Sequence, residues 1–314
     1  MLKKILGYKD FHFDYFKRRK LYYIISLLVI LPGLFIAIFF GMNQGLDFTG
    51  GSIMEITYDQ SVDLADVRDI VNRETAQNPS VNVTDEGRFI IRTSAMEESE
   101  NVALTAALSE LGEVTVLRSE LIGPLVGAEI LRNARNALLI AGILMLLYIT
   151  LRFKLNYALT AIIGLVHDVL VIISVFAIFR IEIDQSFIAA ILTVVGYSIN
   201  NTIVIYDRIR ENTGLMSTKI DNIALINASI NQTLTRNINT VLAVLFLLLC
   251  LLFFGGETTK NFIFAMTVGI TAGFYSSIFL IGGFLNALTN RFGGTLGGSR
   301  KKTISVKNKK SASA

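Results

Sequence analysis

The sequence is poor in cysteine, histidine and charge. Its 314 residues include one cysteine and two histidines, and charged residues make up 17 % of the chain. Because one cysteine cannot form an internal disulfide, any domain outside the membrane must fold without one. Cys250 lies in an apolar run, where we expect a small buried residue. Since the sequence contains no cluster of histidine and cysteine, we expect no metal site and no cofactor.

Apolar residues dominate instead and gather into long runs. They make up 52 % of the chain, and a soluble domain would carry nearer a quarter of charged residues. The runs cover residues 21–40, 136–151, 157–179, 186–206, 238–254 and 262–288. The first is longer than the apolar part of a signal peptide, so we expect an uncleaved membrane anchor. The sequence therefore predicts an α-helical polytopic membrane protein with six spans.

Basic residues define the predicted orientation. Seven Lys and Arg residues precede the first run and seven follow the last, whereas the short loops predicted outside hold only Arg180 and Lys260. Positive charge favours the cytoplasmic side, which places both termini in the cytoplasm and the protein in the cytoplasmic (inner) membrane. Arg132 and Arg135 run against this rule, but they follow a long translocated segment, which crosses largely regardless of charge. Because basic clusters beside spans are typical of lipid anchors, we expect contact with the lipid bilayer and no nucleic acid.

The segment between the first two runs predicts a small separate domain. It is acidic, and its pattern indicates strand, helix, strand, strand, helix and strand (βαββαβ), the order of the α+β ferredoxin-like fold. Ser61 is the expected cap of its first helix, and residues 85–87 form the turn between the middle strands. The domain has no histidine, no cysteine and no phosphate-binding loop. We expect either a solvated acidic face or a surface that meets extended polypeptide by strand addition.

These observations divide the chain into five parts. They are a basic cytoplasmic N-terminus (1–20), a first transmembrane helix (21–41), an extracytoplasmic α+β domain (42–132), a five-helix transmembrane domain (133–290) and a basic cytoplasmic tail (291–314). A cytoplasmic loop covers residues 207–237 of the five-helix domain. Regularly spaced isoleucines in this loop predict a helix that lies on the membrane surface.

Two ionisable side chains in the runs are candidates for ion coupling. Charge deep in a membrane is costly, so each such residue is a functional candidate. Asp168 lies near the middle of the third run, beside His167, and no other carboxylate lies so deep. A buried structural pair, or a hydrogen bond between helices, explains it equally well. Arg236, at the start of the fifth run, could reach an acceptor in the membrane or extend to the interface.

The fourth run carries a polar stripe. Thr193, Tyr197, Asn200 and Asn201 lie near one helical face, and Gly196 leaves room for a close neighbour. Asparagine can hydrogen-bond across helices but does not titrate near neutral pH. The stripe alone therefore favours helix packing over an ion pathway, and Asn200 and Asn201 are kept as further ion-coupling candidates.

Charged and small residues near other spans favour structural roles. Asp207, Arg208 and Arg210, at the end of the fourth run, predict a cluster of salt bridges at the membrane interface. Gly269 and Gly273 form a GxxxG pattern in the last run, which is typical of closely packed helices.

Two blocks of the sequence resemble a known family. They contain Gly45, Asp47, Phe48, Thr49, Gly50 and Gly51 in the first block, and Gly196, Tyr197, Asp207 and Arg208 in the second. Together they resemble the SecD/SecF family of protein-export membrane proteins, in the resistance–nodulation–division superfamily, over nearly the whole chain. The resemblance implies an auxiliary, non-enzymatic subunit of the Sec translocase. With a SecD-like subunit and the SecYEG translocon, it would use the proton motive force to promote export of a translocating polypeptide.

One position departs from the family pattern. The family usually has an aspartate, linked to proton passage, where this chain has Asn201. Three hypotheses follow: coupling runs through the partner's own aspartate with Asp168 assisting, the chain uses another ion, or the chain is structural.

Three other functions stay open at this point. A proton-coupled small-molecule exporter of the same superfamily would have two repeated halves, and this chain shows one. An enzyme would need a nucleophile and base or metal ligands at depth, and the sequence contains no HExxH or GxSxG. A non-motor scaffold that stabilises the translocon would support export without any dependence on the proton gradient.

Overall fold

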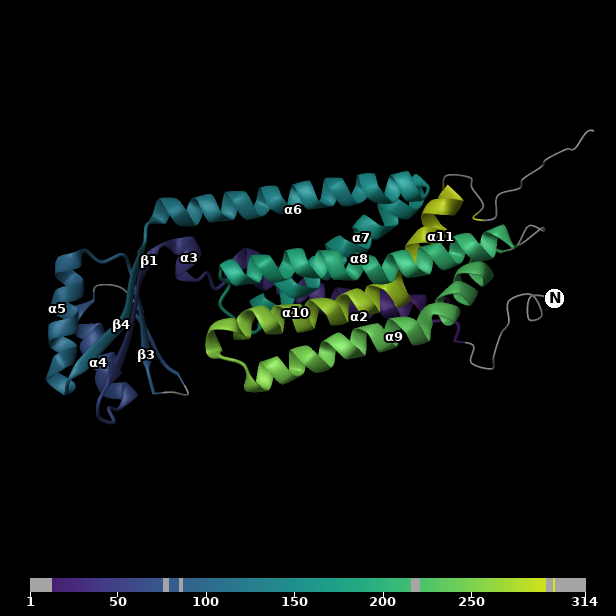
Figure 1. Ribbon diagram of the computed structural model, residues 1–314. Helices are drawn as coiled ribbons and strands as arrows, with labels where there is room; N and C mark the ends of the chain where they lie inside the picture. Colours follow the sequence, from purple (N-terminus) through teal and green to yellow (C-terminus); the bar gives the residue numbers. More distant parts are fainter. Residues whose placement is uncertain (1–12, 76–78, 85–86, 216–220, 292–295, 297–314) are drawn as a thin grey trace, which may run out of the picture.

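Long helices form a bundle that carries a small α+β domain at one end (Figure 1). The computed structural model describes residues 13–75, 79–84, 87–215, 221–291 and 296. Within these residues six helical segments are long and apolar enough to cross a membrane, as predicted. They are α2 (Arg19–Phe39), α6 (Pro124–Arg152), α7 (Leu155–Ile178), α8 (Gln185–Gly214), α9 (Asn222–Phe254) and a last span made of α10 (Glu257–Tyr275), a π-helical turn (Ser276–Leu280) and α11 (Ile281–Arg291). The predicted basic termini lie mostly outside the described residues.

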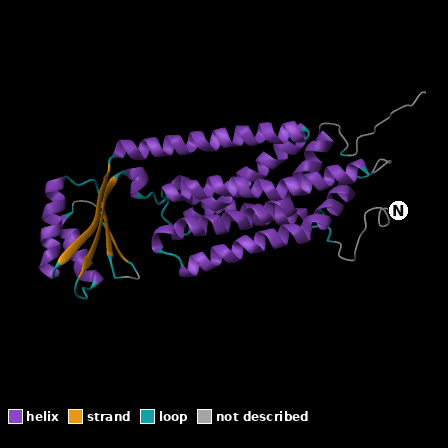
Figure 2. Ribbon diagram, in the orientation of Figure 1, coloured by secondary structure: helices purple, strands orange, loops and turns teal. Residues whose placement is uncertain are grey.

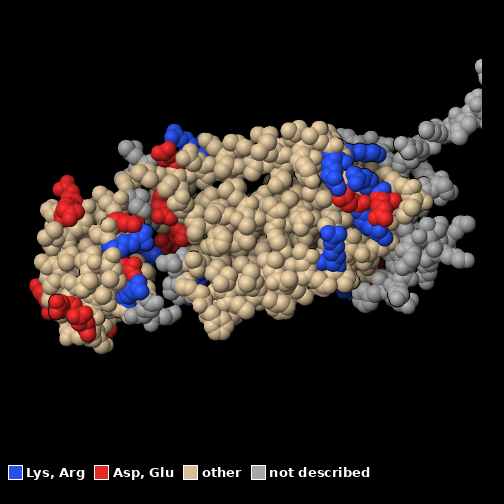
Figure 3. Space-filling view, in the orientation of Figure 1, with Lys and Arg blue, Asp and Glu red and all other residues tan. Residues whose placement is uncertain are grey.

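On the face shown in Figure 3, the middle of the bundle carries no charged side chains. In Figure 3 acidic and basic side chains lie on the α+β domain and at the opposite end, with an uncharged belt between them. Large apolar side chains such as Leu28, Leu144 and Phe246 are exposed on this belt. Apolar residues that face outward in this way require a lipid environment, so the protein is a multi-pass membrane protein.

Two spans are longer than the apolar runs that predicted them. The apolar run 136–151 is short for a span, and α6 extends into the polar residues before it and begins at Pro124, with proline in the first turn, where its missing N–H costs nothing. The predicted surface helix within 207–237 is wrong, because α8 continues to Gly214 and α9 begins at Asn222 as one unbroken helix. Its apolar positions Ile226 and Ile230 are buried in the bundle core and do not lie on a membrane surface.

The α+β domain has the predicted ferredoxin-like order. Its elements are β1 (Gly51–Tyr58), α4 (Leu64–Glu74), β2 (Ser80–Val83), β3 (Phe89–Thr93), α5 (Glu98–Leu108) and β4 (Val114–Ile122). The strands form an antiparallel sheet in the order β2-β3-β1-β4, with both helices on the face turned away from the bundle (Figure 2). Alternate apolar residues of β1 and β3 pack against these helices. Residues 85 and 86 of the predicted turn lie outside the described part.

The predictions for the first helix cap of the domain and for Cys250 are wrong. The helix cap is Asp63 and not Ser61, because the Asp63 carboxylate accepts the Ala65 N–H at 3.0 Å. Cys250 is exposed on the outer surface of α9 and not buried.

Glycines allow the spans to approach closely at some crossings only. A Cβ on Gly33 of α2 would lie 2.2 Å from the Ser174 Cβ of α7, so no side chain fits there. The prediction for Gly269 and Gly273 is confirmed, because each lies against α8, where added carbons would come within 3 Å of side chains. The prediction for Gly196 is wrong, since a Cβ there would meet no atom within 4 Å.

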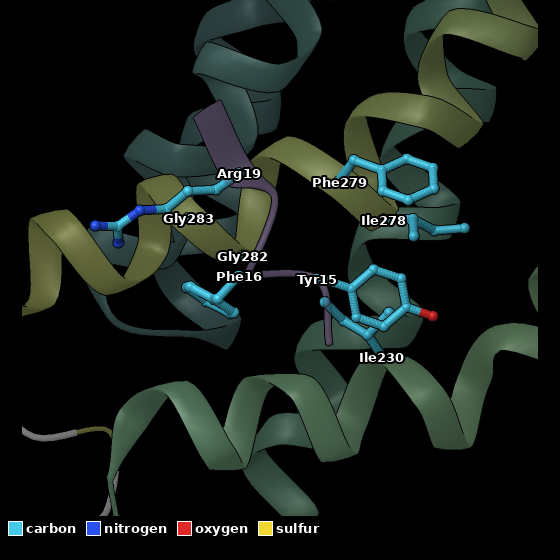
Figure 4. A pocket seen from close by; sticks show the side chains of 8 residues that line it. All are labelled: Tyr15, Phe16, Arg19, Ile230, Ile278, Phe279, Gly282 and Gly283. Atoms are coloured by element: carbon cyan, nitrogen blue, oxygen red, sulfur yellow. The ribbon is translucent and has the colours of Figure 1, made fainter. Parts of the chain in front are cut away.

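Hydrogen bonds join the segment before α2 to α9, at the end of the bundle opposite the α+β domain. Asn231 accepts the Phe13 N–H at 3.2 Å and donates to the Phe13 carbonyl at 2.9 Å. The Asn227 side chain donates to Asp14 at 2.9 Å, and this hydrogen bond lowers the pKa of the Asp14 carboxyl. Figure 4 shows the small, mostly apolar pocket beside this segment, from which the Arg19 guanidinium points away. The contacts tie the start of the first span to the fifth.

Candidate functional site

Asp168 is buried in the bundle and held by donors from neighbouring spans. The side chain, on α7, is 1 % exposed. Its Oδ2 accepts hydrogen bonds from the Ser198 hydroxyl of α8 at 2.5 Å and from the Ser276 hydroxyl of the π-helical turn at 3.1 Å. Its Oδ1 lies 2.9 Å from His167 Nδ1. Because a bare carboxylate in this setting is very costly, these partners are what make burial of the group tolerable.

His167 extends the network to the first span. Its Nε2 lies 3.0 Å from the Ser26 hydroxyl of α2. Its ring stacks on Tyr275, with 6.4 Å between centroids, and the Tyr275 hydroxyl donates to the Tyr22 carbonyl of α2 at 2.8 Å. A continuous polar network thus joins α2, α7, α8 and the last span.

Both carboxylate oxygens of Asp168 have hydrogen-bond partners in the network. A carboxylate only accepts hydrogen bonds, whereas a carboxylic acid also donates one. A proton on Oδ2 would compete with the two serine hydroxyls that donate to this oxygen, whereas a proton on Oδ1 would face His167 Nδ1. Ser276 is the first residue of the π-helical turn, and such turns are frequent at functional sites in helices. A proton on Oδ2 would in this way change the contacts of Asp168 with α8 and the last span.

The structure does not bring all four ion-coupling candidates together. Asn201 is 2 % exposed, and its Nδ2 finds no acceptor among the described residues. Asn200 and Arg236 are exposed on the bundle surface, on α8 and α9. Only Asp168 belongs to the network.

The exposed candidates lie on a polar face of the bundle. Asn200 shares its exposed side of α8 with Thr193 and Gly196. Tyr197 crosses to α9, where its hydroxyl donates to the Thr240 carbonyl at 3.0 Å. Exposed polar groups in an apolar belt are expensive next to lipid, so this face is suited to a protein neighbour.

The first family block lies where the α+β domain meets the bundle. A short helix, α3 (Leu46–Thr49), fills this junction. Asp47 accepts the Gln185 N–H at 2.8 Å, and the Phe48 ring is buried among α7, α8 and α10 side chains. The Thr49 hydroxyl donates a hydrogen bond to the Gly45 carbonyl at 3.3 Å. Gly50 has φ of 75° and Gly51 has φ of 153°, a conformation that explains why both positions are glycine.

The second block forms the predicted salt-bridge cluster at the opposite end. Asp207 pairs with Arg152 of α6 and with Arg210, each at 2.9 Å. Arg208 donates to Gln232 of α9 at 2.6 Å and pairs with Glu211 at 2.7 Å. The block therefore holds three spans together.

Sequence reasoning missed two members of the network. Ser26 is a single small polar residue in its apolar run, whereas Ser276 is followed by Ser277 in a run that also contains threonines, and many such serines only bond to their own helix backbone. Only Ser26 carried a signal, as the one serine in an otherwise aliphatic and aromatic run.

Comparison with known protein families identifies the family of this chain. The family model described as "Protein export membrane protein SecD/SecF, C-terminal" matches residues 103–291, which is more than half of the chain. The chain belongs to the SecD/SecF family. The model described as "SecD/SecF GG Motif" matches residues 35–62, the segment that contains the junction helix.

Within the SecD/SecF family, the curated relatives that this chain matches are SecF subunits. The protein translocase subunit SecF of Acidaminococcus fermentans is 41 % identical over 278 residues, covering 86 % of this chain and 95 % of the relative. The SecF subunit of Haemophilus influenzae is 38 % identical over 271 residues, covering 85 % and 83 %. The chain is therefore a SecF-type translocase subunit, a transport protein without catalytic activity.

A solved structure supports the same assignment. The crystal structure of SecDF from Thermus thermophilus, described as a translocon-associated membrane protein, superposes with a TM-score of 0.81 at 32 % identity. The match covers 90 % of this chain and 39 % of the solved chain. This SecF-type chain thus spans well under half the length of that SecDF protein.

Proposed function

We propose that this chain promotes polypeptide export and that the proton motive force drives this activity. It works with a SecD-like subunit at a SecYEG translocon in the cytoplasmic membrane. In this proposal Asp168 is the group of this subunit that gains and loses a proton. The observation that carries it is burial: among the described residues, Asp168 is the one buried carboxylate, and hydrogen bonds link it to two other spans. Asn201 cannot take this role because an amide does not titrate.

The energy available is sufficient to shift a hydrogen-bond network. Moving one elementary charge through a potential of 100 mV releases about 2.3 kcal/mol. A hydrogen bond to a charged group contributes about 1.5–3 kcal/mol. One proton per cycle is therefore of the right size to break one of the two hydrogen bonds that the serines donate to Asp168.

Two unpartnered surfaces support a SecD-like subunit as the neighbour. The first is the exposed side of α8 with Thr193, Gly196 and Asn200. The second is the sheet edge at β4, where residues 115–121 are all exposed, with Leu117 at 48 % and Leu121 at 60 %. A long exposed edge strand is a template for pairing with another chain. A partner that contains its own outer domain and spans would cover both surfaces.

The orientation in this proposal has the α+β domain outside and both termini in the cytoplasm. The support is the bias of Lys and Arg toward the end of the bundle opposite the α+β domain (Figure 3). In this orientation the α+β domain lies on the side of the membrane where chains emerge from the translocon.

The proposal is tested by export of a secreted reporter in cells that lack the chain. Complementation with the wild-type gene is expected to restore export. A protonophore is expected to return export to the uncomplemented level, while translocation of a control reporter that does not need this chain continues. Rescue that is unaffected by the protonophore would support the scaffold function instead. Restored drug efflux with unchanged protein export would support a small-molecule exporter.

A further inference from the structure

The salt-bridge cluster at the ends of α6 and α8 holds more positive than negative charge. Arg152, the last residue of α6, and Arg210 of α8 both pair with Asp207, each at 2.9 Å. Lys154, just before α7, is exposed, and its ammonium group makes no hydrogen bond or ion pair within the described residues. Three basic side chains thus gather around one carboxylate, and Figure 3 shows Lys and Arg collected at this end of the bundle.

The two guanidinium groups are held in place and remain accessible. Both lie over the buried Phe153 ring, at 5.7 Å and 5.3 Å from its centroid. Their side chains are 42 % and 55 % exposed, and a guanidinium has five N–H donors, more than the contacts with Asp207 use. The nearby Glu211 does not supply the missing negative charge, because it pairs with Arg208 at 2.7 Å.

The cluster lies where the uncharged part of the bundle ends. α6 has no charged residue between Arg135 and Arg152, and α8 has none before Asp207. Residues 185–206 of α8 rise about 33 Å, close to the thickness of the hydrocarbon core of a bilayer. The basic side chains are therefore at the depth of the lipid headgroups.

Apolar side chains face outward beside the cluster. Leu147, Leu151 and Leu155 are exposed next to Arg152, with Leu151 at 80 %. Tyr148, one turn before Arg152, is also exposed, and tyrosine is typical of the boundary between headgroups and acyl chains. The surface thus combines basic groups at headgroup depth with leucines at the depth of acyl chains.

The cluster also joins α6 to α8. Among the described residues, the hydrogen bonds and ion pairs between these two helices are those of Arg152 with Asp207 and Arg210. Near the other end of α6, an added Cβ on Gly127 would lie 2.4 Å from the backbone of α3, whereas one on Gly142, in the middle, would meet no atom within 4 Å. α6 is thus held close at its ends and less closely in between.

We propose that Arg152, Lys154 and Arg210 bind the phosphate of an anionic phospholipid, whose acyl chains lie against the exposed leucines beside the cluster. A phosphate accepts paired hydrogen bonds from a guanidinium and supplies the negative charge that the cluster lacks. The cytoplasmic leaflet is rich in anionic lipid, and basic sites at the ends of spans attract it. The bound lipid secures the inner end of α6 against α8. This site does not depend on Asp168 or on the proton gradient.

The experiment is native mass spectrometry of the full chain released from detergent micelles. The probe is dioleoyl phosphatidylglycerol, and dioleoyl phosphatidylcholine has the same acyl chains without the net negative charge. Inorganic phosphate, added in excess to a third sample, tests whether a soluble anion competes for the site. The wild type is expected to retain one phosphatidylglycerol under conditions that remove phosphatidylcholine, and excess phosphate is expected not to displace it.

A matched pair of variants locates the site. Lys154→Gln with Arg210→Gln removes two of the basic groups and leaves Arg152 paired with Asp207, so the contact between α6 and α8 persists. Arg132→Gln with Arg135→Gln makes the same change in charge on exposed residues in the outer half of α6. Phosphatidylglycerol affinity is expected to fall at least about tenfold in the first variant and to stay at the wild-type value in the second. The rise in Tm that phosphatidylglycerol gives the wild type should likewise disappear only in the first variant.

Four results would overturn the inference. The first is equal retention of the two lipids by the wild type, and the second is equal affinity for phosphatidylglycerol in the two variants. The third is displacement by inorganic phosphate, which would indicate a site for a soluble anion. The fourth is loss of the retained lipid when the chain is co-purified with the SecD-like subunit, which would indicate that the partner covers this surface. None of them bears on the proposed function, which the protonophore sensitivity of export decides separately.

Discussion

Asp168→Asn is expected to reduce export to the level of cells that lack the chain, while the protein accumulates normally. Asparagine has the shape of aspartate and keeps one acceptor oxygen for Ser198 or Ser276, so the bundle should assemble. The amide cannot bind and release a proton, so the step that couples to the gradient is lost. The measurement is pulse-labelled processing of a secreted precursor, with membrane levels of the variant read by immunoblot.

The control for this variant is Asp184→Asn. It makes the same chemical change in the same bundle, but asparagine caps a helix as well as aspartate does. Export in this control should stay at the wild-type level and remain sensitive to a protonophore. If Asp168→Asn also retained protonophore-sensitive export, the titrating group of the complex would lie elsewhere, and the role of Asp168 would be structural.

Gly33→Ala is expected to be among the most destabilising single-methyl additions in the bundle. The new Cβ would lie 2.2 Å from Ser174 Cβ and 2.4 Å from Ser174 Cα, and a backbone atom cannot turn aside. Overpacking of this kind costs about 1–3 kcal/mol and sometimes more, so α2 must shift away from α7. The shift would also separate Ser26 from His167. Thermal unfolding in detergent should show a Tm lower by several degrees, together with reduced export.

Gly196→Ala is the matched control for this prediction. Gly196 is also a glycine within a span, but no atom lies within 4 Å of its added Cβ. Alanine is the better helix former by about 1 kcal/mol, so stability should be unchanged or slightly higher in the isolated chain. A Tm for Gly33→Ala equal to that of Gly196→Ala would show that α2 and α7 do not cross as closely as described.

The spans and the α+β order were predictable because each depends on local pattern. Apolar runs mark spans by length, and alternation in residues such as Met54 and Ile56 marks a strand with one buried face. Helix ends were less predictable. α6 continues to Pro124 and α9 starts at Asn222 because backbone hydrogen bonding in a helix does not stop where apolar sequence stops.

The candidate site was predictable only in part. Asp168 is conspicuous as a lone carboxylate in an apolar run. Ser276, about 110 residues away in sequence, reaches Asp168 only through helix packing, and Ser26, about 140 residues away, reaches the neighbouring His167 in the same way. The difference between Asn200 and Asn201 also depends on packing. Asn200 is exposed, whereas its neighbour Asn201 is buried and its Nδ2 has no hydrogen-bond partner among the described residues. No sequence pattern distinguishes such neighbours without knowledge of which helices flank them.

The measurement that tests the central claim most directly is proton flux through the purified complex. The chain and its SecD-like subunit are reconstituted in liposomes that contain a pH-sensitive dye, an inward proton gradient is imposed, and liposomes with the SecD-like subunit alone give the background. The account predicts flux above this background for the wild type and flux at the background for Asp168→Asn. Equal flux for the wild type and Asp168→Asn would contradict it.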